Sequence, residues 1–136
     1  MRIVLDTNCL LPSIFEASPY YWVWEGFCER KFSLCCTTEM LHEYAELLAD
    51  FYSQEISESI METIMNSNNI EEITPHYKWN LITADPDDNK FVDCALNSGA
   101  DYLVSNDKHF NILKKIDFPK INVIGIDEFA TILSKS

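Results

Sequence analysis

Two aspartates stand at the ends of predicted strands of this chain. Asp6 directly follows the apolar run Arg2–Leu5 (RIVL), and Asp107 follows the stretch YLVSN. If both strands belong to one parallel sheet, both side chains project from the same sheet edge, where ligands bind in such folds. Each aspartate alone is more simply interpreted as a helix N-cap, a position that Asp fills well. Together they are candidates for one polar site.

A third carboxylate comes from the helix predicted after the second strand. On a helical wheel, Glu43 flanks the apolar stripe of this helix, whereas Glu39 and Glu46 point further outward. The stripe consists of Met40, Tyr44, Leu47 and Leu48. Taken alone, Glu43 is better explained as part of a solvated helix face.

The fourth carboxylate begins a helix predicted from about Asp87 to Ser98. Asp88 lies three, four and seven residues before Phe91, Val92 and Ala95, which form the buried stripe, while Asp87 lies near its edge and Asp93 is expected to face away. A carboxylate on a buried stripe needs a partner, because an unpaired buried charge is very costly. The alternative is that Asp87 and Asp88 only share the capping of the helix.

Four carboxylates at one sheet edge would repel each other strongly. Such a cluster is tolerated when it binds cations or is partly protonated. Oxygen ligands favour hard ions such as Mg²⁺ and Mn²⁺. Open acidic metal sites serve phosphoryl chemistry, in which the ion activates water and shields phosphate oxygens.

Alternating strands and helices must position these residues, which predicts a three-layer α/β/α sandwich with a mostly parallel five-stranded sheet. Strands are expected over Arg2–Leu5, Phe32–Cys36, Ile70–Ile73, Tyr102–Ser105 and Ile121–Ile124. Helices are expected over Cys9–Phe15, Tyr20–Arg30, Thr38–Phe51, Gln54–Asn66, Asp87–Ser98 and Lys108–Lys115, with a last one from Asp127 to about Leu133. Thr7 or Asn8 is expected to cap the first helix and Asp127 the last, and Gly99 is expected to end the helix that begins near Asp87.

Composition sets the class of protein. The chain has 136 residues, 47% of them hydrophobic, which fits one domain over residues 1–136 and excludes general disorder. The apolar runs are too short for a membrane span or a signal peptide, so a cytoplasmic protein without membrane association is expected. The five cysteines show no CxxC spacing and the three histidines are scattered, so no zinc site is expected.

Three motifs resemble those of the PIN-domain nucleases, in particular the branch of toxins from toxin–antitoxin pairs. They are LDTNCLL (Leu5–Leu11), EMLHEYAELL (Glu39–Leu48) and DPDDNKFVDCALNSGADYLVSND (Asp85–Asp107). The last is the most specific, since its order of helix, Gly-Ala, strand and Asp runs for over twenty residues.

The resemblance implies the roles of specific residues. The family's four acidic positions match Asp6, Glu43, Asp88 and Asp107, and Thr7 or Asn8 resembles the small polar residue that supports the site. It further implies the strand order 3-2-1-4-5 and cleavage of single-stranded RNA with Mg²⁺ or Mn²⁺. Asp6, Asp88 and Asp107 would hold the metal, and Glu43 would orient the attacking water or a second ion. Family members often form homodimers and are often silenced by an antitoxin protein.

The strong acidity makes RNA binding depend on local basic patches. The chain carries 22 acidic and 10 basic residues, and setting the four site acids aside changes its formal net charge from −12 to −8. A generic nucleic-acid binder has excess positive charge. The residues expected to contact RNA are Lys90, Lys108, His109, Lys114 and Lys115. A solvated surface helix explains this cluster equally well.

Other functions stay open at this point. A catalytically silent interaction module would keep the fold and bind only a partner, for example through the aromatic stretch Tyr20–Phe27 (YYWVWEGF), which also suggests a dimer interface. A receiver-like phosphoacceptor domain also places Asp at strand ends, but it requires an acidic pair after strand one, where this chain has only Asp6. The sequence does not distinguish RNA from DNA as substrate.

Overall fold

The computed structural model describes residues 1–135, and its centre is a five-stranded parallel sheet. The strands are β1 (Arg2–Leu5), β2 (Ser33–Cys36), β3 (Ile70–Glu72), β4 (Tyr102–Val104) and β5 (Val123–Ile124). Their order is β3-β2-β1-β4-β5, and every pairing is parallel, which confirms the predicted sheet. Because β1 is central and pairs with β4 through Leu5 and Val104, the carboxyl ends of these two strands lie side by side.

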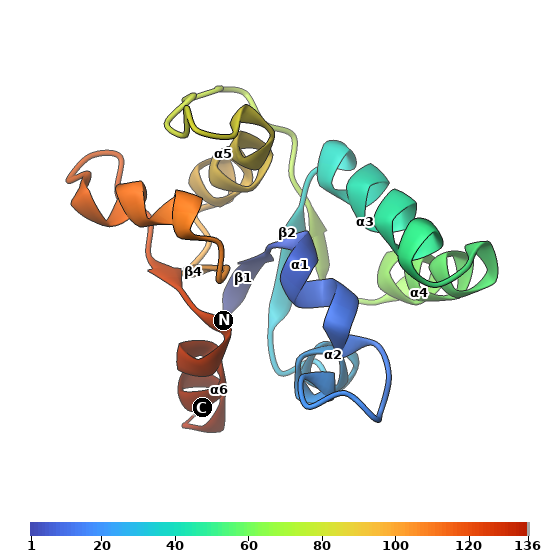
Figure 1. Cartoon of the computed structure of the whole chain (residues 1–136). Coiled ribbons are helices and arrows are strands. Elements are labelled where there is room, and N and C mark those ends of the chain that lie inside the picture. Colours follow the sequence, from blue (N-terminus) through green and yellow to red (C-terminus); the bar gives the residue numbers. More distant parts are fainter. Residues whose placement is uncertain (136) are drawn as a thin grey trace.

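Helices cover both faces of the sheet, as Figure 1 shows, with α3 and α5 above it and α2 and α6 below it. The α-helices are α1 (Thr7–Leu10), α2 (Tyr21–Cys28), α3 (Thr38–Phe51), α4 (Gln54–Asn66), α5 (Asn89–Ser98) and α6 (Ile126–Ser134). Three 3-10 turns, η1 (Leu11–Ser13), η2 (Pro86–Asp88) and η3 (Lys108–Lys115), complete the described elements. None of the helices in residues 1–135 has the length and apolar character needed to cross a membrane.

The central strands β1 and β4 are largely buried and are accordingly apolar runs, whereas the edge strand β3 is partly exposed and contains two glutamates. Ile3 and Val4 point to opposite faces of β1, and both are fully buried. Below the sheet, the Phe129 ring of α6 lies 5.6 Å from the Trp22 ring of α2 and 5.2 Å from the Phe32 ring, between ring centroids. Much of the aromatic stretch on α2 therefore serves the core.

The caps differ in part from the predicted ones. Asp6, rather than Thr7 or Asn8, caps α1, because its Oδ1 accepts the backbone N–H of Asn8 at 3.4 Å. The predicted helix over Cys9–Phe15 is shorter, since α1 passes into η1. Gly125, rather than Asp127, is the N-cap of α6.

The start of α5 also differs from the prediction. The 3-10 turn η2 precedes the helix, so α5 begins two residues later than expected. Gly99 ends it with φ at +67°, in the left-handed region that suits glycine. Asp93, expected to face away, is buried instead, because its Oδ1 accepts the backbone N–H of Trp79 at 3.0 Å from the irregular segment 74–85 that covers the helix.

Candidate active site

Asp6 and Asp107 meet at the carboxyl edge of β1 and β4. A serine that sequence reasoning missed links them: Ser105 Oγ donates to Asp6 Oδ2 at 2.6 Å and accepts the backbone N–H of Asp107 at 3.0 Å. Asp6 is 4% exposed, and this burial raises its pKa. The hydrogen bond from Ser105 opposes the rise, whereas the charges of Asp107 and Glu43 add to it. Asp6 is thus a fixed, crowded carboxylate.

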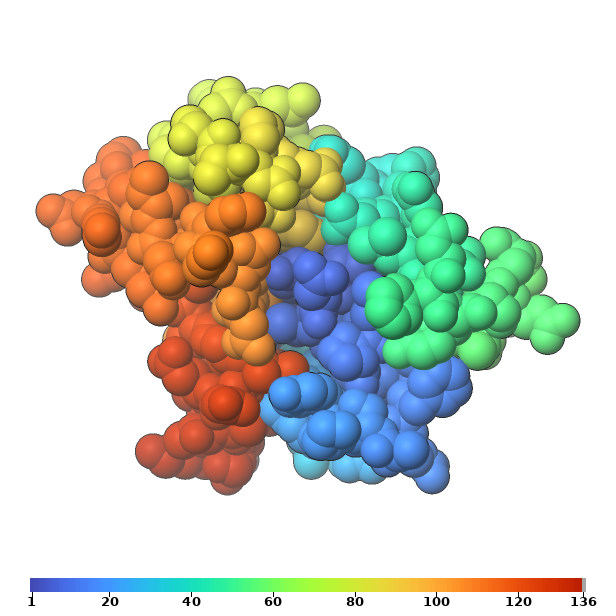
Figure 2. All heavy atoms as spheres, in the orientation of Figure 1, coloured from blue at the N-terminus to red at the C-terminus, as the bar shows by residue number. Residues whose placement is uncertain are grey.

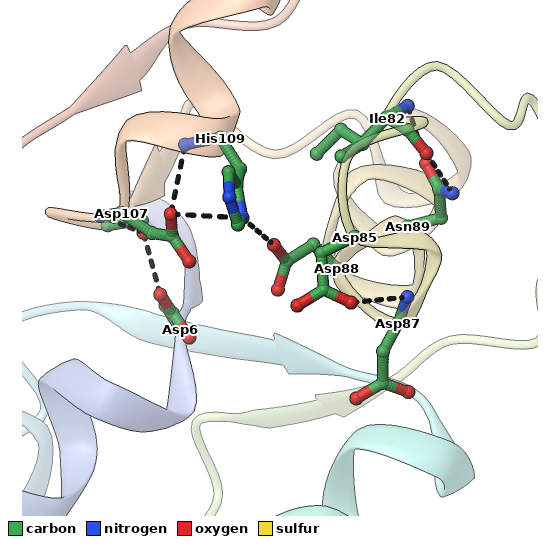
Figure 3. A network of polar contacts seen from close by, with 9 residues as sticks. Asp6, Ile82, Asp85, Asp87, Asp88, Asn89, Asp107 and His109 are labelled. Carbon is green, nitrogen blue, oxygen red and sulfur yellow. Dashed lines mark hydrogen bonds and ion pairs between the residues drawn. The ribbon is translucent and has the colours of Figure 1, made fainter.

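Asp88 faces the same space from the end of η2 (Figure 3). His109 lies between it and Asp107: its Nδ1 is 3.2 Å from Asp88 Oδ2 and 3.4 Å from Asp107 Oδ1. The pKa of Asp88 is raised to about 6, chiefly by burial and in addition by the charges of Asp107, Asp85 and Asp6, while the hydrogen bond with His109 opposes the rise. These neighbouring carboxylates therefore disfavour one another's ionised forms.

Glu43 reaches the cluster from α3, and both of its oxygens have partners. Thr7 Oγ1 donates to Glu43 Oε2, and Lys90 Nζ lies 2.9 Å from Glu43 Oε1. Lys90 also lies 2.7 Å from Asp87 Oδ1. Burial alone would lower the pKa of Lys90, but its hydrogen bonds to Asp87 and Glu43 raise it, so the ammonium stays charged. Of the two predicted supporting residues, Thr7 holds Glu43, whereas the exposed Asn8 contributes only its backbone N–H to Asp6.

Asp85 is a further acidic residue of the site that sequence reasoning passed over. One atom each from Asp85, Asp88 and His109 forms a group in which all three lie within 4.8 Å of one another, a spacing that suits a metal ion. Asp85 Oδ1 also accepts the backbone N–H of Asp87 at 3.2 Å, so this side chain caps η2. Pro86 at the first position of the turn was the available signal, since it favours a turn that returns Asp88 to the side of Asp85.

The residues expected to contact nucleic acid separate into two groups. Lys108, Lys114 and Lys115 are exposed on η3, directly after Asp107. Lys90 and His109 belong to the acidic cluster instead. The Lys90 side chain is only 4% exposed, and its ammonium faces two carboxylates, so it is poorly placed for contact with a phosphate backbone.

A cleft opens beside Asp6 and Asp107. Its volume is about 330 Å³, and it is lined by Asp6, Asn8, Cys9, Pro12, Tyr20, Asn106, Asp107 and Ile126. On the face drawn in Figure 2, the blue N-terminal segment is bordered by the orange segment of η3 and the yellow segment that begins α5. Two of the four predicted site acids, Asp6 and Asp107, therefore line an open cleft.

The donor set fits a divalent cation. Asp85, Asp88 and His109 offer ligand atoms at a spacing that suits a metal ion, and Asp6 and Asp107 lie beside them. Burial first, and the charges of neighbouring carboxylates second, raise the pKa of Asp6 and of Asp88. A cation relieves such repulsion by favouring the ionised carboxylates. Hard oxygen ligands suit Mg²⁺ and Mn²⁺, and a histidine ligand is compatible with the second.

Comparison with known proteins agrees with this architecture. The model of the family described as "PIN domain" matches residues 2–109, a range that contains all four predicted site acids. The fold is similar to that in the crystal structure of VapBC2 from Rickettsia felis bound to a DNA fragment from its promoter. That match has a TM-score of 0.63 and 19% sequence identity, and it covers 92% of this chain and 98% of the other. The search of curated proteins found no match.

Proposed function

The chain belongs to the PIN-domain family, and on that premise we propose that it is a metal-dependent endoribonuclease that cleaves single-stranded RNA. The observation that supports this most is the convergence of Asp6, Asp88 and Asp107. They come from three elements that span residues 6 to 107 of the sequence, yet each lies near enough to another to perturb its pKa or share its histidine.

The three aspartates would hold Mg²⁺ or Mn²⁺, and Asp88 belongs as well to the metal-spaced group that it forms with Asp85 and His109. A bound divalent cation supplies charge stabilisation for a scissile phosphate and lowers the pKa of water. Ser105 fixes the orientation of Asp6, and His109 holds Asp88 and Asp107 at a set separation. Glu43, held by Thr7 and Lys90, orients the attacking water and receives its proton.

The substrate would reach the site along η3. Lys108, Lys114 and Lys115 are exposed there and provide the local positive charge that an acidic protein needs to bind a phosphate backbone. RNA, rather than DNA, is proposed from the family resemblance alone. The cleft beside Asp6 and Asp107, of about 330 Å³, would receive the scissile phosphate.

A role as the toxin of a toxin–antitoxin pair is part of the proposal. It is supported by the resemblance of the motifs and by the similarity of the fold to the VapBC2 structure. Homodimer formation through α2 is proposed as well, although Val23, Trp24 and Phe27 of that helix are buried in the core. Only its remaining surface, which includes the half-buried Tyr21 and Trp22, is available for a partner.

The proposal is tested by incubating the purified protein with labelled RNA and DNA of the same sequence, in Mn²⁺, Mg²⁺ or EDTA. We expect RNA cleavage that requires metal. The cleavage rate of the Asp6→Asn variant should fall by at least ~10–100-fold, the loss that removal of an outer-shell partner causes at a metal site. The control variant Asp117→Asn, at an exposed loop position, should cleave at the wild-type rate. Cleavage by Asp6→Asn at the wild-type rate would refute the proposed site, and cleavage of DNA alone would refute the proposed substrate.

A further inference from the structure

Lys90 is a buried cation inside an acidic active site. Its side chain is 4% exposed, and lysine is almost never buried to this degree without a partner. Its Nζ lies 2.9 Å from Glu43 Oε1 and 2.7 Å from Asp87 Oδ1, distances typical of charge-assisted hydrogen bonds. The ammonium therefore bridges α3 and η2 across the edge of the site.

This bridge occupies the carboxylate oxygens on one side of the cluster, which could otherwise bind a metal ion. Glu43 Oε1 is bound by Lys90, and Glu43 Oε2 accepts the hydroxyl of Thr7. Asp87 is 70% exposed at its side chain, so the ion pair stands at the mouth of a cleft of about 470 Å³ that solvent ions can enter. The cleft is lined by Glu39, His42, Glu43, Glu46, Leu47, Asp87 and Lys90.

Acidic phosphoryl-transfer sites often hold two divalent ions about 4 Å apart, which share and divide the carboxylates between them. The donors in this site fall into two sets. Asp6, Asp88 and Asp107 face one another and are linked only by Ser105 and His109. Glu43 and Asp87 face Lys90. The second set therefore already binds a cation, the Lys90 ammonium.

We propose that the Lys90 ammonium replaces the second divalent ion, so that this protein binds a single ion, at the Asp6–Asp88–Asp107 side. The inference rests on the proposed function, which it deepens by fixing the number of ions. Lys90 is then a positioning residue: its ion pair keeps the Glu43 carboxylate aimed at the site without contact to the substrate. A tethered cation of this kind is permanently bound, whereas a second ion would have to be recruited from solution.

The test is the number of Mn²⁺ ions bound by the full chain, measured by titration calorimetry and by the electron paramagnetic resonance signal of free Mn²⁺. We expect about one ion per wild-type chain. Lys90→Met keeps the length of the aliphatic stem and removes the charge, which leaves Glu43 and Asp87 free for a second ion, so this variant should bind about two. Two bound Mn²⁺ ions would also broaden each other's signal, a readout that loss of structure alone does not produce.

Matched variants separate charge from packing. Lys90→Arg keeps the cation and should still bind about one ion, as should Lys114→Met, which removes an exposed lysine of η3. If Lys90→Met does not give the wild-type circular dichroism spectrum, Lys90→Gln, which also removes the charge but keeps a polar end, is the second variant and should also bind about two. Binding of two Mn²⁺ ions by the wild type, or of one ion by the folded Lys90→Met and Lys90→Gln variants, would overturn this inference but leave the proposed function standing. Absence of Mn²⁺ binding by every variant overturns the proposed function with it.

Discussion

Replacing Asp88 by asparagine should stabilise the metal-free protein while removing its response to metal. The Asp88 side chain is 14% exposed, and the surrounding burial and carboxylates raise its pKa from 3.8 to about 6. Such an increase corresponds to a penalty of up to ~3 kcal/mol for the ionised group in the folded state. Solvent at the cleft screens part of this, so we expect Asp88→Asn to gain ~1–2 kcal/mol at pH 7 in EDTA.

The pH dependence gives this prediction its sign. Because the pKa of Asp88 is higher in the folded state than in the unfolded state, the penalty is complete above pH ~7, and it disappears as the pH falls below the unfolded value near 4. At pH 5 about half of it remains. The advantage of Asp88→Asn over the wild type should therefore shrink from pH 7 to pH 5.

Urea unfolding of both proteins in EDTA, at pH 7 and pH 5, measures the effect directly. In thermal unfolding the expected gain corresponds to a rise in Tm of roughly 3–8 °C. Mn²⁺ should raise the Tm of the wild type, because it binds the folded state, and should leave Asp88→Asn nearly unchanged. Asp117→Asn, which removes an exposed charge, is the control. A variant that is less stable than the wild type in EDTA at pH 7 would show that Asp88 is not under electrostatic strain.

Three further substitutions test how the fold supports the site. Asn89→Ala removes the two hydrogen bonds that hold Ile82 of the covering segment, at 2.9 and 2.8 Å, and should cost ~1–3 kcal/mol in urea unfolding and speed proteolytic cleavage of that segment. Tyr44→Phe leaves the buried carbonyl of Leu5 without its hydroxyl donor and should lower the free energy of unfolding by ~1–3 kcal/mol with Mn²⁺ affinity unchanged. Gly99→Ala places a side chain at φ +67° and should cost ~1–2 kcal/mol by the same measurement. If one of these variants unfolds with the same free energy as the wild type, the contact or backbone conformation that it tests does not stabilise the fold.

Strands such as β1 and β4 could be predicted because each is a short apolar run and the central strand β1 is buried on both faces. The order of the strands came from the resemblance, since apolar runs such as RIVL and YLV do not encode their neighbours. Periodicity also placed Phe91, Val92 and Ala95 correctly in the core, where all three are buried. Local pattern was sufficient wherever burial alone decided the conformation.

Pattern failed where a distant contact decides the role of a side chain. A wheel placed Asp93 toward solvent, but the segment 74–85 folds over α5 and brings the Trp79 N–H to it. Lys90 was assigned to RNA because it is basic, yet its partner Glu43 lies 47 residues earlier in the chain. Asp6 caps α1 and so leaves Thr7 free to hold Glu43, a division of roles that no local propensity predicts.

The most direct measurement is the anomalous difference density of crystals grown or soaked with Mn²⁺. The account predicts a peak within coordination distance of Asp6, Asp88 and Asp107, with Lys90 still paired to Glu43. Mn²⁺ located away from these aspartates, or no peak at a concentration that supports RNA cleavage, would contradict it.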